Sequence, residues 1–468
     1  MNKYGKKFLL SALFPIILGA CATTTNPSSS QMPAAAGTEE PSASSQRNEP
    51  VNLEMYTWWT GADQEMCQAV FDAFNEERSA IKVTVNFIPY DNYSSKLNTS
   101  MAADKAPDIF LLQEYLANEW GEKGVSMDLN PLYAEAGQSP AEIYVDSALF
   151  TTNGKLWGVS PNMCTILMYY NKELLENAGI DAPTADASKP WTWEEYVAAA
   201  RKMTTDTSGK HPGEDGFNKD SIQTYGTLTP TSSLALSSLL YSNGVGFANA
   251  DGMELEIVSD NAVNVLQSVA DLSLLEYVAP SIASAKSLPQ SPAMLMNGQL
   301  AMMIDGSWQA GEFSKENYDV GIAATPMFAA PAGIAWSSAL VMSAKTQSPK
   351  EAFEALSYML DYNKVIEICA PLNIGVGNLP NLIASYENAD QKAAWSKYYN
   401  TDLGNVTTNL MTNIARLGEC VTLKGYGEIV EQIIIPELDR LWLGEVDAKE
   451  AVAGAEANAA GKLNGVWK

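Results

Sequence analysis

The feature that most restricts how this chain can fold is an alternation of strand-like and helix-like segments near its start. Apolar and polar residues alternate from Val51 to Thr57 and again over residues 81–87, a pattern typical of half-buried strands. Helical spacing of apolar residues fills the stretch between them and recurs over residues 92–103, before the apolar run Ile109–Leu112. This β-α-β-α-β order predicts an α/β fold with a mostly parallel sheet flanked by helices.

Polar and aromatic residues follow the predicted strands at the place where such sheets bind ligands, beyond the carboxyl ends of the strands. Trp58 and Trp59 end the first strand, and Gln113, Glu114 and Tyr115 follow the third. Adjacent residues of a strand face opposite sides, so we expect one tryptophan in a cleft and the other in the core. For the residues after the third strand, a solvated loop is the alternative to ligand contact.

One tryptophan in the second half of the chain stands apart from the predicted secondary structure. Leu300–Ile304 and Val320–Ala323 are predicted strands, with a turn at Asp305-Gly306 between them. Trp308 follows that turn and belongs to no helical or strand stripe. We expect Trp308 to line a cleft, and packing in the core is the alternative.

The charge of the chain limits its partners. Its 468 residues include 29 Lys+Arg and 55 Asp+Glu, and loss of an N-terminal segment with three lysines leaves 26 against 55, a formal net charge of −29. Such a balance argues against nucleic acid and polyanionic ligands and leaves neutral or cationic small molecules open. The single histidine, His211, lies in a predicted exposed loop, which excludes most chemistry that needs imidazole. We expect no metal and no cofactor.

The N-terminus predicts export. Residues 1–20 combine a basic start with an apolar run of signal-peptide length, and Leu18-Gly19-Ala20-Cys21 resembles a bacterial lipobox. Cys21 is then the lipid-bearing N-terminus of a cell-membrane lipoprotein, facing the extracellular or periplasmic side; an ordinary signal with a chance cysteine is the alternative. Residues 21–50, rich in Ser, Thr, Ala and Pro, predict a disordered tether.

Four further cysteines lie far apart in the sequence, at positions 67, 164, 369 and 420. Their spacing does not fit a zinc site. In an exported protein they form either two disulfides, in one of three pairings, or remain as buried free thiols. The residues alone leave both arrangements open for Cys67, Cys164, Cys369 and Cys420.

Six segments, in order, carry a resemblance to a known family. They are TWWTG, FIPYDNYSSKL with AADKAPDIF, GKLWGVSPNMCTILMYYNKELLENAGI, WTWEEY, NGQLAMMIDGSW and WSSALVMSAKTQSPKEAFEALSYML. With them the chain resembles the extracellular solute-binding proteins of sugar ABC transporters, the class that includes maltose-binding protein. The resemblance spans residues 51–468.

The resemblance implies a type II periplasmic-binding-protein-like fold with two α/β lobes, each a mostly parallel sheet flanked by helices, and a ligand cleft between them. Lobe 1 is expected to comprise residues 51–162 plus 337–383, and lobe 2 residues 163–336 plus 384–468. The implied function is capture of a sugar or oligosaccharide by a monomer that closes on it and delivers it to a membrane permease. The sugar, its chain length and the permease stay open, as does a non-sugar solute such as a polyol phosphate.

The resemblance also implies further cleft residues. Asn162 and Met163 lie in one expected crossing between the lobes and Trp336 in another; Trp308 matches a cleft tryptophan of related binders, and Tyr426 is a weaker candidate. Aromatic side chains suit this role because a pyranose has an apolar face, whereas Asp, Glu, Asn and Gln satisfy its hydroxyls.

The rival class is an exported carbohydrate-active hydrolase, which needs two carboxylates about 5 to 9.5 Å apart across a cleft. Nothing among the 55 acidic residues selects such a pair, and no nucleophile elbow, phosphate-binding loop or dinucleotide motif appears. We therefore predict a binding protein and no enzyme. An adhesion lipoprotein is a third possibility. Such a protein would not need aromatic residues in a cleft.

Overall fold

The computed structural model describes residues 49–376, 378–398 and 401–467, without the side chains of residues 315, 396–398, 401–405 and 412. The predicted signal peptide, the lipidation of Cys21 and all but the last residues of the tether lie outside the described residues. Across the described ranges, no helix combines the length and the apolar character needed to cross a bilayer.

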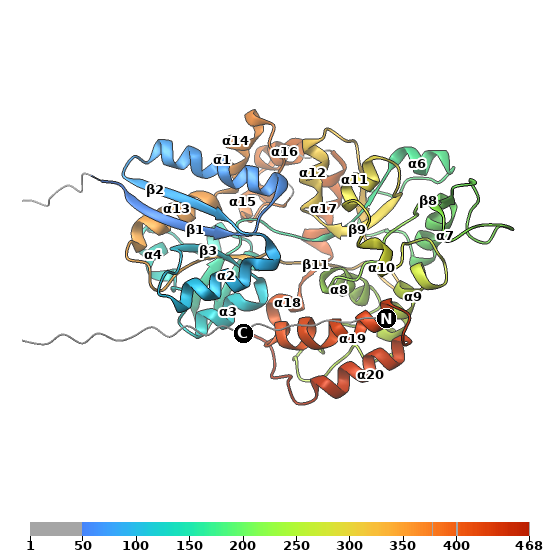
Figure 1. Cartoon of the computed structure of the whole chain (residues 1–468). Helices are drawn as coiled ribbons and strands as arrows, with labels where there is room; N and C mark the ends of the chain where they lie inside the picture. The colour runs from blue at the N-terminus through green and yellow to red at the C-terminus, as the bar shows by residue number, and fades with distance from the viewer. Residues whose placement is uncertain (1–48, 377, 399–400, 468) are drawn as a thin grey trace, which may run out of the picture. The chain divides into compact units, whose positions relative to one another are not determined.

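A six-stranded sheet forms the centre of one of the two sheet regions of the described domain (Figure 1). Its order is β2-β1-β3-β12-β5-β4. β1 pairs in parallel with β2 and β3, as the β-α-β-α-β pattern predicts, whereas β12 runs antiparallel to both β3 and β5. The strands are β1 (Val51–Thr57), β2 (Ile81–Phe87), β3 (Ile109–Leu112), β4 (Leu149–Thr152), β5 (Lys155–Val159) and β12 (Ala339–Met342).

The prediction of mostly parallel strands is wrong for both sheets. Three of the five strand pairings in the larger sheet are antiparallel, and both pairings in the second sheet are. β6 (Ile166–Tyr170) lies between β9 (Met302–Gly306) and β10 (Gly321–Ala324) and runs antiparallel to both. Apart from Asp305 in β9, the three strands consist of buried residues that are almost all apolar, and such runs indicate a buried strand without indicating its direction. The parallel prediction, drawn from residues 51–112, therefore did not transfer to this sheet.

The predicted turn at Asp305-Gly306 is also wrong. β9 continues through both residues, since Gly306 pairs with Ile166 and Asp305 with Leu167. The chain leaves the sheet at Ser307 and enters helix α12 (Gln309–Lys315), with Trp308 as its N-cap. A glycine is required at 306 for a different reason, because a β-carbon there would lie 2.1 Å from the Trp308 ring.

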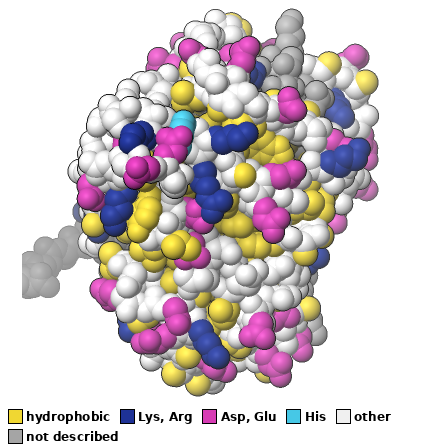
Figure 2. Space-filling view, turned by 90° about the vertical axis from the view of Figure 1, so that its right-hand side faces the viewer, with side chains coloured by type: hydrophobic (Ala, Val, Ile, Leu, Met, Phe, Trp, Pro, Cys, Tyr) yellow, Lys and Arg dark blue, Asp and Glu magenta, His cyan; other side chains and the backbone are white. Residues whose placement is uncertain are grey.

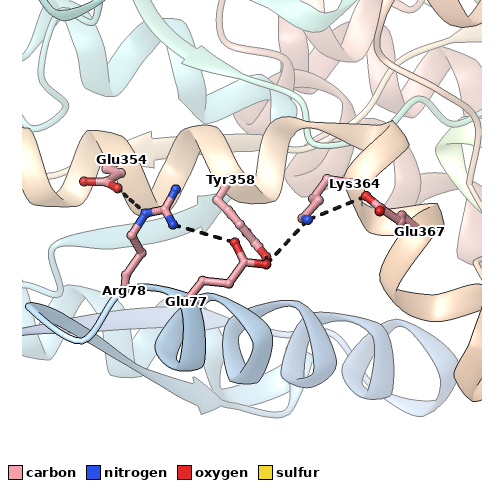
Figure 3. A network of polar contacts seen from close by, with 6 residues as sticks. All are labelled: Glu77, Arg78, Glu354, Tyr358, Lys364 and Glu367. Atoms are coloured by element: carbon pink, nitrogen blue, oxygen red, sulfur yellow. Dashed lines mark hydrogen bonds and ion pairs between the residues drawn. The ribbon is translucent and has the colours of Figure 1, made fainter.

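Helices α1 (Gly61–Glu77), α13 (Pro349–Leu360) and α14 (Tyr362–Leu372) pack together beside the larger sheet, and a polar network fixes their ends (Figure 3). Arg78 Nε donates to Glu354 Oε1 at 2.6 Å, and Glu77 accepts a hydrogen bond from the Tyr358 hydroxyl at 3.1 Å. Lys364 lies 3.5 Å from Glu77. The network joins the carboxyl end of α1 to α13 and α14.

The remaining elements complete the two regions and their connections. They are α2 (Tyr90–Ala102), α3 (Glu114–Glu122), α4 (Asn130–Glu135), α5 (Pro140–Ile143), η1 (Asp146–Ala148), α6 (Lys172–Asn177), α7 (Trp193–Met203), β7 (Thr205–Asp206), β8 (Ile222–Thr224), α8 (Ser233–Ser242), α9 (Asp260–Leu274), α10 (Ile282–Ala285), α11 (Ser291–Met296), β11 (Gly333–Ala335), α15 (Ile383–Glu387), α16 (Ala389–Tyr398), α17 (Thr401–Asn413), β13 (Ala415–Leu417), α18 (Glu419–Thr422), η2 (Gly427–Ile434), α19 (Ile435–Trp442) and α20 (Ala448–Ala459).

Three connecting segments between the sheet regions lie side by side. The first joins β5 to β6, the second joins β11 to β12, and the third follows α14. Met163 and Leu379 exchange two backbone hydrogen bonds of 2.8 Å, and Cys164 and Trp336 exchange two of 2.6 and 3.1 Å. The crossings expected at residues 162–163 and at Trp336 lie in the first two segments. The third segment lies next to the expected lobe boundary at residues 383–384.

The four cysteines of the described chain are buried and free, which decides between the two arrangements left open by the sequence. Burial raises the pKa of the thiols of Cys164 and Cys369 to about 12. Thiols with so high a pKa carry little thiolate at neutral pH and are poor nucleophiles. Cys67, Cys369 and Cys420 serve as small apolar core residues.

One face of the domain is shown as a surface in Figure 2. Acidic and basic side chains lie interspersed on it among scattered apolar patches, and no field of one sign covers it. His211 is half-buried, and its Nδ1 lies 2.8 Å from the carbonyl oxygen of Thr204, so its ring is more enclosed than predicted. Any charge preference for a ligand therefore has to come from a particular cavity and not from this face as a whole.

Candidate ligand-binding cavity

A cavity of about 510 Å³ opens where the two sheet regions meet. Its walls come from the ends of β1, β3 and β9, the first turns of α1, α2, α3 and α8, and the connecting segments. It is lined by Trp58, Trp59, Thr60, Asp63, Tyr90, Leu111, Gln113, Glu114, Pro161, Asn162, Cys164, Ser232, Leu234, Asp305, Trp308, Trp336, Ser337, Ser338 and Asn378.

Two larger hollows are weaker candidates. One, of about 680 Å³, lies beside α6, and the other, of about 670 Å³, lies between α1 and α14. Neither is lined by a tryptophan among the described residues, and each is formed within one sheet region. The 510 Å³ cavity is distinguished by its convergent aromatic and polar groups, which are the mark of a ligand site.

One wall of the cavity is built on Trp58. Its ring meets Tyr93 edge-on at 4.8 Å between centroids and Tyr90 edge-on at 5.7 Å. Trp58 itself is half-buried, whereas Trp59 is 8% exposed and packs in the core below α1. The expected division of the pair, one side chain toward a cleft and one toward the core, matches this arrangement, although Trp59 also reaches the cavity wall.

The opposite wall is built on Trp308. Its ring lies over Gly306 and meets Trp336 edge-on, with 6.1 Å between centroids and an angle of 87°. Trp336 is 3% exposed and is held at its backbone by Cys164. The two indoles thus form a rigid corner whose apolar surface faces the cavity.

Carboxylates stand at the first turns of two helices. Glu114, 9% exposed, begins α3 directly after β3, and burial together with the charge of Glu431 raises its pKa to about 7. Asp63 lies in the first turn of α1, where burial and the neighbouring Glu312 raise its pKa to about 7. At helix N-termini the dipole favours the charged form, so desolvation here outweighs the dipole.

The amino end of α1 is fixed by the other sheet region. The Ala62 amide donates to Glu312 Oε1 of α12 at 2.9 Å, and a β-carbon at Gly61 would collide with the same oxygen. Thr60 makes no side-chain cap, so Glu312 satisfies one of the unpaired amides of this helix end. This contact places Asp63 beside the cavity.

Amide and hydroxyl groups of the connecting segments form the floor. Ser337 Oγ donates to Asn162 Oδ1 at 3.2 Å, and Ser307 Oγ donates to Asn378 Oδ1 at 3.0 Å. Cys164 Sγ lies 3.3 Å from the same Asn378 oxygen. The floor therefore offers hydrogen-bonding groups to a ligand while linking the three segments to one another.

The structure brings together seven of the ten predicted site residues. Those lining the cavity are Trp58, Trp59, Gln113, Glu114, Asn162, Trp308 and Trp336. Met163 is fully buried, because it alternates with Asn162 and Cys164 along an extended segment and faces the core. Tyr115 and Tyr426 pack against each other, 6.0 Å between centroids, with Tyr426 only 1% exposed. These three residues lie outside the cavity wall.

Several lining residues were not singled out by the sequence. Asp305 was predicted only as a turn residue, and the sequence analysis did not predict Asp63, Tyr90, Ser232 or Asn378 as site residues. Tyr90 gave the clearest available signal, since it is an aromatic residue shortly after the second predicted strand; the structure places it at the start of α2, 57% exposed. The other residues line the cavity because of tertiary packing, which no local sequence pattern predicts.

The model of the family described as bacterial extracellular solute-binding protein matches residues 59–362. The chain therefore belongs to this family. This confirms the prediction of a solute-binding protein with a two-lobed, type II periplasmic-binding-protein fold. The family supports this prediction over the alternative of a hydrolase.

Two curated relatives and one solved structure illustrate the likeness. The sn-glycerol-3-phosphate-binding periplasmic protein UgpB of Rhizobium meliloti is 24% identical over 430 residues, which cover 84% of this chain and 90% of the relative. The arabinooligosaccharide-binding protein of Bacillus subtilis is 23% identical over 264 residues, covering 55% and 56%. The ABC substrate-binding protein Lmo0181 of Listeria monocytogenes, solved with cycloalternan, superposes with a TM-score of 0.73 at 23% identity, covering 87% of this chain and 98% of that one.

Proposed function

We propose that this protein captures a sugar or oligosaccharide in the 510 Å³ cavity and delivers it to the membrane permease of an ABC importer. The observation that carries the proposal is the pairing of two tryptophan walls, at Trp58 and Trp308, with a floor of amides and hydroxyls. The walls suit the apolar face of a pyranose, and the floor suits its hydroxyls.

The energetics of such a site are sufficient for capture. Burying roughly 100 Å² of apolar surface on one indole contributes about 2.5 kcal/mol before ordering costs. Two or three such contacts, with the hydroxyls hydrogen-bonded, reach about −8 kcal/mol, which corresponds to micromolar affinity. Micromolar binding retains the solute yet permits its release to a permease.

The relatives suggest two kinds of solute, a polyol phosphate and an oligosaccharide. The cavity favours the second kind. Its described lining contains no lysine, arginine or histidine, whereas a phosphate ester needs cationic or amide donors that balance its charge. Three carboxyl groups in the wall, Asp63, Glu114 and Asp305, would repel a phosphate.

Closure of two lobes around the solute is part of the proposal. Residues 51–162 plus 337–383 would form one lobe and residues 163–336 plus 384–468 the other, with the hydrogen-bonded connecting segments as the hinge. Cavity residues from both lobes would then approach one another. Small-angle scattering should give a smaller radius of gyration with ligand, and an unchanged profile at saturation would contradict closure.

The cellular setting follows from the N-terminus. We infer export, a diacylated Cys21 and a tether that holds a monomeric binding domain near its permease, because two acyl chains suffice for stable anchoring. Cys21→Ala should move the protein from the membrane fraction to the medium or soluble fraction. Retention in the membrane despite the substitution would defeat the anchor.

The binding function is tested by a thermal-shift screen of neutral mono- and oligosaccharides, with sn-glycerol-3-phosphate included. A ligand at a hundred times its dissociation constant stabilises the folded state by about 2.7 kcal/mol, which is a shift of several degrees. A matched saccharide series should contain at least one such hit. Stabilisation by sn-glycerol-3-phosphate alone would overturn the proposal.

A further inference from the structure

One short helix carries both a wall of the cavity and a contact with the opposite sheet region. α12 connects β9 to β10, the outer strands of the second sheet, and Phe313 anchors it there with its ring 5.5 Å from that of Tyr169. Trp308, the N-cap of α12, lines the cavity. Glu312 lies four residues further along, and residues four apart share a face of a helix. Trp308 and Glu312 are therefore parts of one helical turn and move together.

Glu312 contacts the amino end of α1, which belongs to the larger sheet region (Figure 1). Its Oε1 accepts the hydrogen bond from the Ala62 amide at 2.9 Å, between residues 250 positions apart in the sequence. The Ala62 amide is one of the first four of α1, which have no partner inside the helix. Thr60 and Asp63, which flank Ala62, line the cavity. The hydrogen bond therefore joins two pieces of the cavity wall that come from different sheet regions.

The contact requires a glycine at the start of α1. A β-carbon at Gly61 would lie 2.0 Å from Glu312 Oε1 and 3.1 Å from its Cδ. Gly61 also has a φ of +56°, in the left-handed region that other residues rarely adopt. The same glycine thus permits both the backbone turn into α1 and the close approach of Glu312.

α12 meets the larger sheet region at a second point. A β-carbon at Gly375, which follows α14, would lie 2.4 Å from the carbonyl oxygen of Gly311 in α12. A backbone oxygen cannot move aside as the end of a side chain can, so this approach also needs a glycine. Because α14 packs on α1, both contacts hold α12 against the same part of the larger sheet region. We call this arrangement, with both contacts made, the seated position of α12.

The two contacts lie outside the cavity lining that the structure describes. The residues that make them are Gly61, Ala62, Gly311, Glu312 and Gly375. Their effect on a solute is therefore indirect. It acts through the spacing of the two tryptophan walls, because Trp308 moves with α12 and Trp58 directly precedes α1.

We propose that Glu312 is a positioning residue for the solute, whose hydrogen bond to α1 keeps α12 seated and so holds the Trp308 wall at the spacing from the Trp58 wall that binds a sugar. This inference rests on the proposed sugar-binding function. Molecules with α12 seated are the ones competent to bind, so the apparent affinity scales with the seated fraction. Gly311 and Gly375 set how closely α12 approaches the larger sheet region.

The first experiment removes the acceptor. Glu312→Ala should weaken binding of the saccharide that gives the largest shift in the thermal screen by about three- to tenfold, as expected for the loss of one hydrogen bond. Titration calorimetry measures the affinity. Stopped-flow tryptophan fluorescence should show that most of the loss is a faster dissociation. The melting curve of the unliganded variant checks that it is folded.

Two matched variants show whether the hydrogen bond is responsible. Glu312→Gln keeps an oxygen that can accept from Ala62 and removes the repulsion between Glu312 and Asp63, so it should restore the affinity to within about twofold of the wild type. Glu316→Ala removes the same charge from an exposed position at the end of α12 and should leave the affinity unchanged. A general structural role of this helix would not distinguish the alanine from the glutamine at position 312.

Gly375→Ala tests the second contact independently. Its methyl group would meet the Gly311 carbonyl oxygen and displace α12, so the affinity should fall by about tenfold or more. Hydrogen exchange of the unliganded protein, measured by mass spectrometry, reports the seated position without a ligand. Residues 60–66 should exchange faster in Glu312→Ala than in the wild type, because the Ala62 amide loses its partner.

The outcomes separate this inference from the proposed function. Unchanged or tighter saccharide binding by Glu312→Ala overturns the positioning role and leaves sugar binding in place. Equal losses in Glu312→Ala and Glu312→Gln, or equal exchange of residues 60–66 in Glu312→Ala and the wild type, also overturn it. Absence of any saccharide hit in the thermal screen overturns the proposed function, and the positioning role with it. If Gly375→Ala does not fold, the Glu312 variants decide.

Discussion

The two tryptophan walls of the cavity are supported in different ways. Trp58 follows a parallel strand and leans on the rings of Tyr90 and Tyr93, and Tyr90 is 57% exposed. Trp308 follows an antiparallel strand and lies over Gly306, a position where the fold leaves no room for a β-carbon. The Trp58 wall therefore depends on side chains that can change conformation, whereas the Trp308 wall depends on the backbone at Gly306. We expect the Trp58 wall to tolerate small changes that the Trp308 wall does not.

The largest expected effect concerns the neighbour of Trp58. Trp59 is 8% exposed in the core, so Trp59→Ala should lower the free energy of unfolding by about 3 to 5 kcal/mol with or without ligand. Trp58→Ala should cost much less stability, because the side chain is half-buried. Chemical denaturation of both variants measures the difference. Equal losses would show that the division of this pair between core and cavity is mistaken.

Next in size is the loss of Trp308 itself. If its ring forms the cavity wall, Trp308→Ala should weaken saccharide binding by about 2 kcal/mol, roughly thirtyfold, from lost apolar contact. The unliganded variant should retain most of its melting temperature. A core role would instead cost about 3 to 5 kcal/mol of stability regardless of ligand. Unchanged affinity in a stable variant would remove Trp308 from the site.

Gly306→Ala sharpens the comparison between the walls. The added methyl group meets the Trp308 ring at 2.1 Å, and overpacking of this kind costs about 1 to 3 kcal/mol. In a Trp308→Ala background the same glycine substitution should cost much less, because the obstructing ring is gone. A double-mutant cycle followed by denaturation measures this coupling. Additive costs would mean that the ring and Gly306 do not depend on each other.

The last expected effect is a pH dependence that comes from the acids of the walls. Asp63 and Glu114 have folded pKa values of about 7, above their ordinary values of 3.8 and 4.5, so the folded state holds protons that the unfolded state has lost. The unliganded protein should lose stability as pH rises from about 4 to about 7, with no further change from these groups above that window.

Two variants check that pH dependence. Asp63→Asn should flatten the melting temperature against pH, and Glu114→Gln should do so independently. The ionisable groups that face Asp63 are Glu312, Cys67 and Cys164. Those near Glu114 are Glu431, Tyr90, Tyr115, Cys164 and Cys420. An unchanged slope in both variants would assign the pH dependence to other groups.

Sequence reasoning reached part of the cavity by local rules. The ends of the first and third strands pointed to Trp58, Gln113 and Glu114, because ligands of α/β sheets bind beyond strand ends. That rule also included Tyr115, which instead packs on Tyr426. A strand end identifies a neighbourhood, whereas the direction of each side chain depends on the helix that follows.

Other parts of the site came from family resemblance or were missed. Trp308, Trp336 and Asn162 come from segments whose closeness depends on crossings far apart in sequence, so no periodicity could have joined them. Asp63 was missed because its position is set by Glu312, 249 residues later in the chain. The antiparallel second sheet was missed because buried apolar strands carry no signal of direction.

The place of β12 in the larger sheet has a consequence for the order in which the sheet can form during synthesis. Residues 339–342 lie between β3 and β5, so the centre of the sheet is supplied by a strand made late in synthesis. Until β12 has been synthesised, the edges of β3 and β5 that pair with it in the sheet have no β12 to pair with. Because β12 pairs with strands more than 180 residues earlier in the chain, we expect the central pairing of this sheet to form only after most of the chain has been made.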